Sequence, residues 1–476
     1  MTVERPPLDP TQVSDTAAFP RITTGNREAD RILGGGFPAN SLNILMGEPG
    51  SGKTLFVEQL LFANAAADRP VLYLTTLSEP LSKVVTYLQR LPFYDASRLG
   101  TEVLYEDMGA QLASEGIGAL VPRVRELILT VGPKLIVIDS FKAVHDLAES
   151  VSEMRRLISE LAGLLAAYDT TCFLVGEYAE ADSATHPEFA VADGVVEFAR
   201  HKLSTRDERF LRVAKLRGSG YLEGLHALHI SGAGVEVYPR LVSPVAPEGY
   251  TTSDERVSIG VAGLDVMLNG GVWRGSTTLV IGPTGAGKTT MGLQFALAGV
   301  AAGEPVLYVN FQENPSQLAR AIRGLTPGGG AAPPPNLHLL YASSVELQID
   351  RIIVAIFKTI ERYGVRRVVI DAVGDLAAAA ADLQRIHDYL YALVQQFAVL
   401  GVTVVLTMES PGLVSSIDET GGDFSRLSYM CDNIVLLEKT RGAQVGRRLS
   451  IYKTRGSGHD DQVRDMAITA TGVHVR

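Results

Sequence analysis

The chain has 476 residues, 46% of them hydrophobic and 20% charged, so it is long enough for two domains that each bury a core. Its formal net charge of −10 argues against a surface built to neutralise a nucleic-acid backbone. No apolar run reaches membrane-spanning length without charges, and the N-terminus lacks the basic and then apolar pattern of a signal peptide. The two cysteines, Cys172 and Cys431, lie in separate halves in apolar segments, which favours buried thiols and a cytoplasmic location.

The chain divides into two similar halves joined by a linker. Residues 1–20 are expected to form a flexible arm, residues 21–243 a first domain and residues 254–476 a second. The linker, residues 244–253, begins with a stretch rich in proline and glycine, as domain boundaries often are.

Both halves repeat one order of elements. An apolar strand, a glycine-rich loop and a helix come first, and apolar strands then alternate with helical stretches. Apolar runs such as residues 135–138 and 368–370 are typical of central parallel strands covered on both faces. The pattern predicts an α/β fold in each half, a mostly parallel doubly wound sheet that ends in antiparallel strands.

A phosphate-binding loop is predicted in each half by the motif G-x-x-x-x-G-K-[ST], at residues 47–54 and 282–289. Its glycines let backbone N–H groups turn toward phosphates at a helix N-terminus, where the helix dipole favours an anion. Its lysine, Lys53 or Lys288, would reach the β- and γ-phosphates of ATP. The residues expected to bind ATP are Gly47, Pro49, Gly50, Ser51, Gly52, Lys53, Thr54, Leu55, Gly282, Thr284, Gly285, Ala286, Gly287, Lys288, Thr289 and Thr290.

An aspartate ends the second apolar strand of each half, Asp139 in the first and Asp371 in the second. At this place a carboxylate can hold Mg²⁺ together with the threonine of the phosphate loop. The expected metal ligands are therefore Thr54, Asp139, Thr289 and Asp371.

Hydrolysis also needs a group that orients or deprotonates the attacking water. Glu79 in the first half and Glu313 in the second are the candidate bases, since both follow the strand after the phosphate-loop helix. Gln312 could position a water molecule but could not accept its proton.

A third duplicated motif is Lys-x-Arg-Gly-Ser, at residues 215–219 and 453–457. Lysine and arginine two residues apart on a strand point the same way, so together they can clamp a γ-phosphate. Matching residues of the two halves lie 235 (Lys53 to Lys288), 232 (Asp139 to Asp371) and 238 (Lys215 to Lys453) residues apart, which indicates a duplicated domain. The other arginine-containing clusters, residues 200–212 and 362–367, are interpreted as solvated faces or subunit contacts.

The motifs in this order, duplicated head to tail, resemble the KaiC family of RecA-like ATPases over nearly the whole chain from Arg21. The resemblance implies two RecA-like P-loop domains, CI and CII, stacked as two rings in an ATP-bound homohexamer. Nucleotide would lie between subunits, and in the clock members CI is a slow ATPase and CII an autokinase and autophosphatase. The residues implied to reach ATP from the neighbouring subunit are Lys215, Leu216, Arg217, Ser219, Lys453, Thr454, Arg455, Ser457 and His459.

The chain departs from the family pattern at three places. Members carry two adjacent glutamates after the second strand, whereas this chain has Leu77-Ser78 before Glu79 and Gln312-Glu313. The paired Ser-Thr phosphosite falls on Ser428-Tyr429, so Ser428 is either a phosphoryl acceptor or a packing serine near the subunit boundary. The chain stops at Arg476, without the tail that recruits KaiA in clock members, so a KaiA-type partner is not expected.

The main hypothesis is thus a slow hexameric signalling ATPase that binds ATP and Mg²⁺, with a KaiB-like partner expected from the resemblance alone. Two alternatives stay open. One is a scaffold stabilised by ATP with little turnover, and the other is a RecA- or DnaB-like ATPase that depends on nucleic acid. The acidic balance of the chain counts against the second of these.

Overall fold

The structure is a computed structural model that describes residues 20–76, 81–202, 207–244, 250, 253–326, 333–344, 347–379, 383–410, 428–440 and 446–476. The chain forms two compact units, Met1–Arg240 and Leu241–Arg476. The expected N-terminal arm, except for Pro20, and most of the expected linker lie outside the described residues. None of the described helices is both long and apolar enough to cross a membrane.

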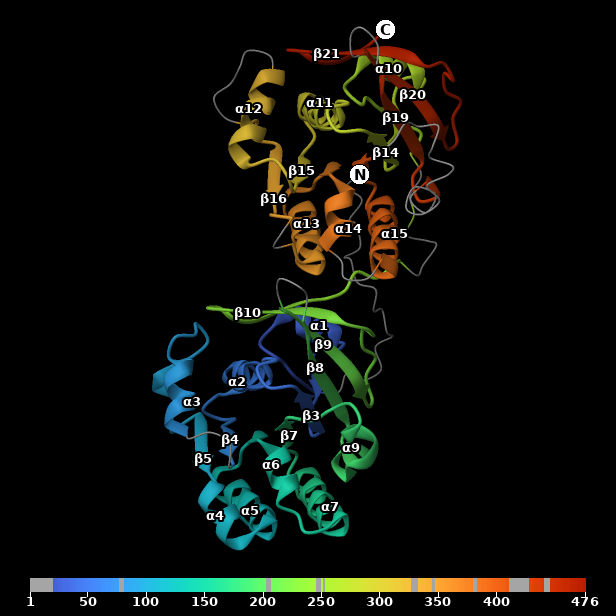
Figure 1. The fold of residues 1–476 in the computed structure, drawn as a ribbon. Helices are drawn as coiled ribbons and strands as arrows, with labels where there is room; N and C mark the ends of the chain where they lie inside the picture. Colours follow the sequence, from blue (N-terminus) through green and yellow to red (C-terminus); the bar gives the residue numbers. More distant parts are fainter. Residues whose placement is uncertain are drawn as a thin grey trace. The chain divides into compact units, whose positions relative to one another are not determined.

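The first unit is built on a nine-stranded sheet in the order β11-β10-β9-β8-β3-β7-β6-β4-β5 (Figure 1). The strands from β8 to β5 pair in parallel, and the β9, β10 and β11 pairings are antiparallel. The strands of this unit are β1 (Arg21–Ile22), β2 (Phe37–Pro38), β3 (Leu42–Gly47), β4 (Val71–Thr75), β5 (Val103–Asp107), β6 (Leu135–Asp139), β7 (Thr171–Gly176), β8 (Gly194–Lys202), β9 (Asp207–Leu216), β10 (His226–Ser231) and β11 (Gly234–Tyr238). Its α-helices are α1 (Arg27–Ile32), α2 (Lys53–Asn64), α3 (Leu81–Leu88), α4 (Gly109–Glu115), α5 (Leu120–Val131), α6 (Phe141–Asp146), α7 (Val151–Ala167), α8 (Asp182–Thr185) and α9 (Pro187–Val191).

The second unit repeats this topology with the order β16-β15-β17-β18-β14-β19-β20-β21-β22. The pairings from β16 to β19 are parallel, and those of β20, β21 and β22 are antiparallel. Its strands are β12 (Arg256–Val257), β13 (Val272–Trp273), β14 (Thr277–Gly282), β15 (Val306–Asn310), β16 (Leu337–Tyr341), β17 (Arg367–Asp371), β18 (Thr403–Glu409), β19 (Asn433–Thr440), β20 (Gly446–Thr454), β21 (Arg464–Thr469) and β22 (Gly472–Val475). Its α-helices are α10 (Ala262–Met267), α11 (Lys288–Ala301), α12 (Pro315–Leu325), α13 (Ile349–Tyr363), α14 (Val373–Ala379) and α15 (Leu383–Val399).

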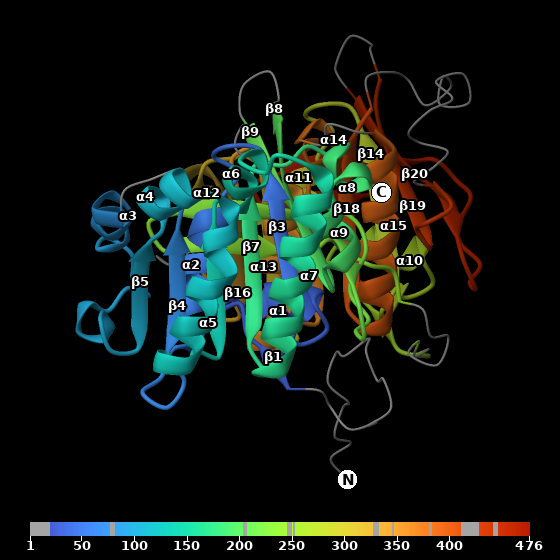
Figure 2. The same ribbon diagram turned by 90° about the horizontal axis from the view of Figure 1, so that it is seen from below.

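Helices cover both faces of each sheet, as the fully apolar strands predict (Figures 1 and 2). In the first unit, one core lies between the sheet and α1, α2 and α3, and a second lies between the sheet and α4, α5 and α7. In the second unit, the corresponding cores lie under α10, α11 and α12 and under α13 and α15. The predicted α/β fold with parallel central strands and antiparallel closing strands is confirmed in both halves.

Candidate nucleotide sites

The phosphate loop of each unit leaves the end of a central strand, β3 or β14, and enters a helix, α2 or α11. The residue before each helix is a glycine with positive φ, Gly52 at 105° and Gly287 at 112°. This backbone conformation is open to glycine and disfavoured for residues with a Cβ. A Cβ on Gly52 would also lie 3.0 Å from Ile230 Cδ1, so the turn requires glycine for two reasons.

The loop lysine of each unit bridges carbonyl groups of its own loop. Lys53 Nζ donates to Gly47 O at 2.8 Å and to Glu48 O at 2.9 Å, and Lys288 Nζ donates to Gly282 O at 2.8 Å. Burial lowers the pKa of both lysines. Both ammonium groups therefore lie within the loop that the sequence predicts to bind phosphates.

A threonine, an aspartate and a tyrosine meet at the start of each phosphate-loop helix. Thr54 Oγ1 donates to Asp139 Oδ2 at 2.9 Å, and Thr289 Oγ1 donates to Asp371 Oδ2 at 2.8 Å. A hydroxyl and a carboxylate so close together are ligands that Mg²⁺ prefers, so each unit brings the predicted metal ligands together.

The tyrosine at this site is a residue that sequence analysis missed. Tyr73 OH donates to Asp139 Oδ2 at 2.8 Å, and Tyr308 OH donates to Asp371 Oδ2 at 2.9 Å. Both tyrosines are buried, and each orients the carboxylate that would hold the ion. The signal was present, because Pro-Val-Leu-Tyr occurs at the matching strand of both halves.

The candidate base of the second unit, Glu313, is close enough to the predicted metal ligand Asp371 to be affected by its charge. Glu313 is partly buried, and burial together with the charge of Asp371 raises the pKa of its carboxyl group. Gln312 is exposed, and its Nε2 donates to Asp375 Oδ2 at 3.0 Å. Glu79, the candidate base of the first unit, lies outside the described residues.

Each loop also contacts an arginine from the antiparallel hairpin of its own unit. Arg209 Nε of β9 donates to Gly50 O at 3.1 Å, and Arg447 Nε of β20 donates to Gly285 O at 3.3 Å. The sequence-based interpretation of residues 200–212 as a solvated face or subunit contact did not foresee this contact, which involves the partly exposed Arg209. Sequence analysis missed it because the hairpin register that brings β9 to the loop is set by tertiary pairing.

A glutamate at the end of the strand next to the phosphate-loop strand, β7 or β18, gives each site a further negative charge. Glu177 follows β7, and Glu409 is the last residue of β18. Of the neighbouring charges, these two have the largest effect on the pKa of Lys53 and Lys288, and both raise it. Sequence analysis did not single out either glutamate.

The Lys-x-Arg pairs lie farther back along the strands than their own phosphate loops, toward the opposite end of the parallel strands. Lys215 of β9 pairs with Val195 of β8, which pairs in turn with Ile44 of β3. Ile44 is three residues before Gly47, so the lysine backbone lies about 10 Å back along the strand from the start of the loop. Lys453 pairs with Ile434, which pairs with Leu279, so the second unit has the same geometry. In neither unit do these cations face the loop of the same unit.

Backbone carbonyl groups of the segment before β8 or β19 accept hydrogen bonds from these cations; in the first unit this segment is α9. In the first unit, Lys215 Nζ donates to Phe189 O at 3.2 Å and Arg217 Nη2 to Ala190 O at 3.4 Å. In the second, Lys453 Nζ donates to Ser428 O at 2.6 Å, and Arg455 donates to the Tyr429 carbonyl.

The other residues implied to reach a neighbour's nucleotide have contacts within their own unit. Ser219 Oγ accepts from Arg21 Nη1 at 2.8 Å, and Ser457 Oγ accepts from Arg256. Each serine thereby ties the Lys-x-Arg loop to the first strand of its unit, β1 or β12. Thr454 Oγ1 lies 2.9 Å from His459 Nδ1, and Leu216 packs in the core of the first unit.

Ser428, the candidate phosphosite, lies just before β19 of the second unit. It is partly buried, Tyr429 is exposed and Cys431 is fully buried. Its carbonyl group takes the place that the carbonyl of Phe189 has in the first unit, since each accepts from the lysine of the Lys-x-Arg pair. The two units therefore match at this turn, with a serine where the first has a phenylalanine.

Comparison with known proteins gives one family. The family described as "ATPase: KaiC" matches residues 22–242, 257–328 and 335–476. The circadian clock protein KaiC2 of Synechocystis sp. is 26% identical over 484 residues, which cover 97% of this chain and 82% of that protein. The circadian clock oscillator proteins KaiC of Thermosynechococcus vestitus and Nostoc sp. are 27% and 28% identical, covering 98% and 96% of this chain and 91% and 89% of theirs. The chain, with two P-loop units of one topology, belongs to the KaiC family of ATPases.

Proposed function

We propose that this protein is a KaiC-like ATPase that binds Mg-ATP in both units, hydrolyses it slowly and assembles as a homohexamer with ATP at the subunit interfaces. The observation that carries the proposal is the position of the Lys-x-Arg pairs. They lie toward the end of the strands opposite their own loops, and this position supports a role at a nucleotide held by another copy of the chain. A cyclic arrangement in which one edge meets the opposite edge of the next copy uses a heterologous interface of this kind.

Within each site the residues take distinct roles. Lys53 and Lys288 bind the β- and γ-phosphates, and the backbone of each loop surrounds them. Mg²⁺ would be held by the Thr-Asp pair, and when bound it neutralises charge on the phosphate oxygens. In the second unit Glu313 accepts the proton of the attacking nucleophile, and its raised pKa brings it closer to neutral pH, where a general base works best.

The finer proposal for the second unit is autophosphorylation of Ser428. Its hydroxyl oxygen would attack the γ-phosphorus of ATP held by a neighbouring copy, with ADP as the leaving group and the proton passing to a base. The chain offers one aliphatic hydroxyl here, since residue 429 is tyrosine. A KaiB-like protein is the partner proposed for the first unit, on the resemblance alone.

Intact-mass spectrometry of the purified protein in Mg-ATP, followed over time with peptide mapping, tests the proposal. We expect ADP to accumulate and one phosphoryl group to appear on the Ser428 peptide. Ser428→Ala should abolish the added mass and leave turnover in the first unit, and Lys288→Ala should abolish the added mass. If ADP accumulates but no mass is added, the protein is an ATPase that does not phosphorylate itself and that signals through its conformation alone. Neither ADP nor added mass would overturn the ATPase proposal in favour of a scaffold.

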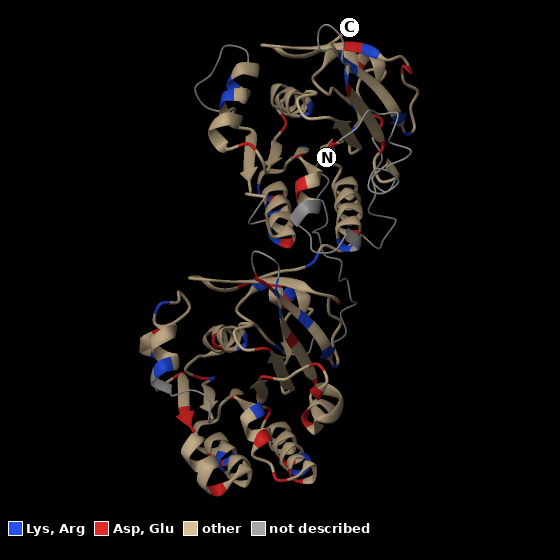
Figure 3. Ribbon diagram, in the orientation of Figure 1, with Lys and Arg blue, Asp and Glu red and all other residues tan. Residues whose placement is uncertain are grey.

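Dependence on nucleic acid is the competing hypothesis, and the distribution of charge disfavours it. Lysine and arginine are interspersed with aspartate and glutamate over both units (Figure 3). Single-stranded DNA added to the same assay is expected to leave the ADP rate unchanged, whereas stimulation would favour the competing hypothesis.

A further inference from the structure

Three side chains of the first unit that do not belong to the phosphate loop meet at the start of α9. His145 lies on α6, His186 directly precedes α9, and Glu188 lies in its first turn. His145 Nδ1 is 3.0 Å from Glu188 Oε1, and His186 Nδ1 is 3.8 Å from the same oxygen. One ligand atom from each residue lies within 4.8 Å of the other two.

We propose that His145, His186 and Glu188 bind a divalent transition-metal ion of the Zn²⁺ class. Two imidazoles and one carboxylate form a donor set that zinc accepts in proteins. With metal–ligand bonds of about 2.0–2.1 Å, the donor atoms of a tetrahedral site lie about 3.4 Å apart. The two distances to Glu188 Oε1, 3.0 and 3.8 Å, lie on either side of this value.

The surroundings of Glu188 fit a metal ligand. Its side chain is fully buried, and Tyr178 OH donates to its Oε1 at 2.9 Å. A hydrogen bond from a residue that does not itself touch the metal orients a carboxylate that does. The Lys142 ammonium, on the same helix as His145, is paired with Asp146.

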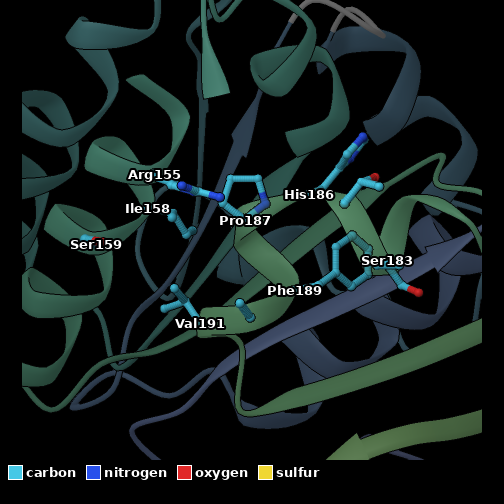
Figure 4. A pocket seen from close by; sticks show the side chains of 11 residues that line it. Arg155, Ile158, Ser159, Ser183, His186, Pro187, Phe189 and Val191 are labelled. Carbon is cyan, nitrogen blue, oxygen red and sulfur yellow. The ribbon is translucent and has the colours of Figure 1, made fainter. Parts of the chain in front are cut away.

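His186 has an available nitrogen and space to turn. Its Nδ1 is buried and makes no hydrogen bond. Its ring stacks on His145 with 4.0 Å between centroids, so a rotation about χ2 is needed to aim Nδ1 at a shared ion. His186 lines a hollow of about 440 Å³ between α7 and the α8–α9 segment, which leaves room for that rotation (Figure 4).

The duplicated ATPase machinery does not account for this cluster. His145 is six residues after Asp139, and the residue six after Asp371 is Ala377. The trio therefore belongs to the first unit, whereas the phosphate-loop lysine, the metal-site aspartate and the Lys-x-Arg pair occur in both.

An ion at this site would affect the segment that holds the Lys-x-Arg pair. It would tie α6 to the start of α9, and the carbonyl groups of Phe189 and Ala190 accept from Lys215 and Arg217. The metal would thus fix the position of α9, whose carbonyl groups hold these two cations. This consequence for activity depends on the proposed role of the cations, but metal binding itself does not.

Titration of the nucleotide-free, chelator-treated full chain with Co²⁺, followed by visible absorption, tests the proposal. Four-coordinate Co²⁺ absorbs strongly in the visible range, whereas an octahedral ion at a Thr-Asp site absorbs weakly. We expect one strongly absorbing Co²⁺ per chain, displaced by Zn²⁺ and not by Mg²⁺, which prefers oxygen ligands. His145→Gln and His186→Gln should each weaken binding by about a hundredfold, the upper range seen when even outer contacts of a metal site are lost.

The matched control is His338→Gln, because His338 also stacks on a ring, that of Tyr363, but lies in the second unit. It should bind Co²⁺ like the unchanged protein. Hydrogen exchange of the peptide spanning residues 187–193 should slow with Zn²⁺ in the unchanged protein and not in His186→Gln, and circular dichroism checks that both variants fold. Absence of strong Co²⁺ absorption, or equal affinity in His186→Gln, would overturn the proposal and leave the trio as a hydrogen-bonded cluster that buries Glu188.

Discussion

Two carboxyl groups near the nucleotide sites, Glu58 and Glu313, lie in surroundings that raise their pKa. Glu58 is on α2, fully buried, and accepts from Tyr105 OH at 2.7 Å. The residue at the same place on α11 is the buried Leu293. The first unit thus keeps an ionisable group where the second has an apolar side chain, and this difference leads to a prediction about stability.

Glu58→Gln is expected to stabilise the first unit increasingly as the pH rises. Burial raises the pKa of Glu58 to about 8, from an ordinary value of 4.5, and the charge of Asp139 adds to the effect. Between these values the folded state binds a proton that the unfolded state has lost, so stability falls with rising pH by about 1.4 kcal/mol per unit. Glutamine keeps a side-chain oxygen that accepts from Tyr105 OH. Because it does not ionise, it avoids the loss of folding stability at high pH.

Calorimetry at about pH 5 and about pH 8 checks this prediction, with a gain expected to be about 3–4 kcal/mol larger at the higher pH. Glu160→Gln, an exposed glutamate on α7, is the matched control and should show no such gain. An equal effect of Glu58→Gln at both pH values would contradict the proposed linkage.

Glu313 leads to a prediction about activity in the second unit. Burial, and then the charge of Asp371, raise the pKa of its carboxyl above 4.5, and a general base must be deprotonated to act. At saturating Mg-ATP, in a Lys53→Ala background that silences the first unit, the rate should therefore fall with acidification at a pH above 4.5. Glu313→Gln should lower the rate by about 10²–10⁴ and remove this limb of the pH profile.

The control for Glu313 is Glu361→Gln, an exposed glutamate on α13. Its pH profile should match that of the background protein. A profile unchanged by Glu313→Gln would exclude Glu313 as the base and favour another carboxylate, such as Glu409.

At the scale of elements, one strand of each hairpin, β9 or β20, carries an arginine near one end and a lysine near the other. Arg209 begins the part of β9 that meets the unit's own phosphate loop, and Lys215 near the other end faces away from it. In β20, Arg447 and Lys453 repeat the arrangement. The strand thus connects the unit's own nucleotide site with the edge that we propose serves the next copy.

Arg209→Ala and Arg447→Ala are expected to weaken ATP binding to the first and second units by about tenfold each, which corresponds to about 1.4 kcal/mol. The reason is the loss of a positive charge and of a hydrogen bond that supports the loop backbone. Equilibrium binding of a fluorescent ATP analogue measures the effect, in a Lys288→Ala or Lys53→Ala background that leaves one site.

Arg448→Ala is a matched control for Arg447→Ala, because Arg448 is adjacent on β20 and pairs with Asp465 on the surface. Its ATP affinity should be unchanged. Equal losses for both variants would indicate a general charge effect and contradict a specific contact with the loop.

At the scale of the whole molecule, the two units share one strand order and one set of site residues, and each leaves its Lys-x-Arg pair directed away from its own loop. If these pairs act on the nucleotide of the next copy, as we propose, a subunit alone would not combine them with a phosphate loop. Activity should therefore depend on assembly, and mixtures of inactive variants can test this.

Complementation between subunits is the expected outcome. In a Lys288→Ala background, Lys53→Ala and Arg217→Ala should each abolish turnover in the first unit. Mixed and reassembled at equal amounts, they should regain roughly a quarter of the rate, because some interfaces join an intact loop to an intact arginine of the next copy. ADP release and native mass spectrometry measure rate and assembly; mixed rings with no regained rate would contradict action between subunits.

The sequence alone determined the α/β fold of both halves and their duplication, and it identified the phosphate loops and the Thr-Asp pairs that the structure brings together. The reason is that these features depend on local patterns: apolar strands, glycines at positive φ and polar residues at strand ends. Thr54 and Asp139, 85 residues apart, meet at 2.9 Å because parallel strands bring their carboxyl ends to one edge.

Only the tertiary structure revealed contacts that depend on strand register and on packing between distant segments. Sequence analysis interpreted the cluster around Arg209 as a solvated face or a subunit contact. It did not foresee that Arg209 reaches Gly50, because the pairing of β9 with β8 decides that contact. It did not single out Tyr73, since a strand tyrosine usually serves the core, nor His145 and His186, which are 41 residues apart on separate helical segments. Side chains brought together by packing leave no regular spacing in the sequence, and so their meeting was decided by the fold.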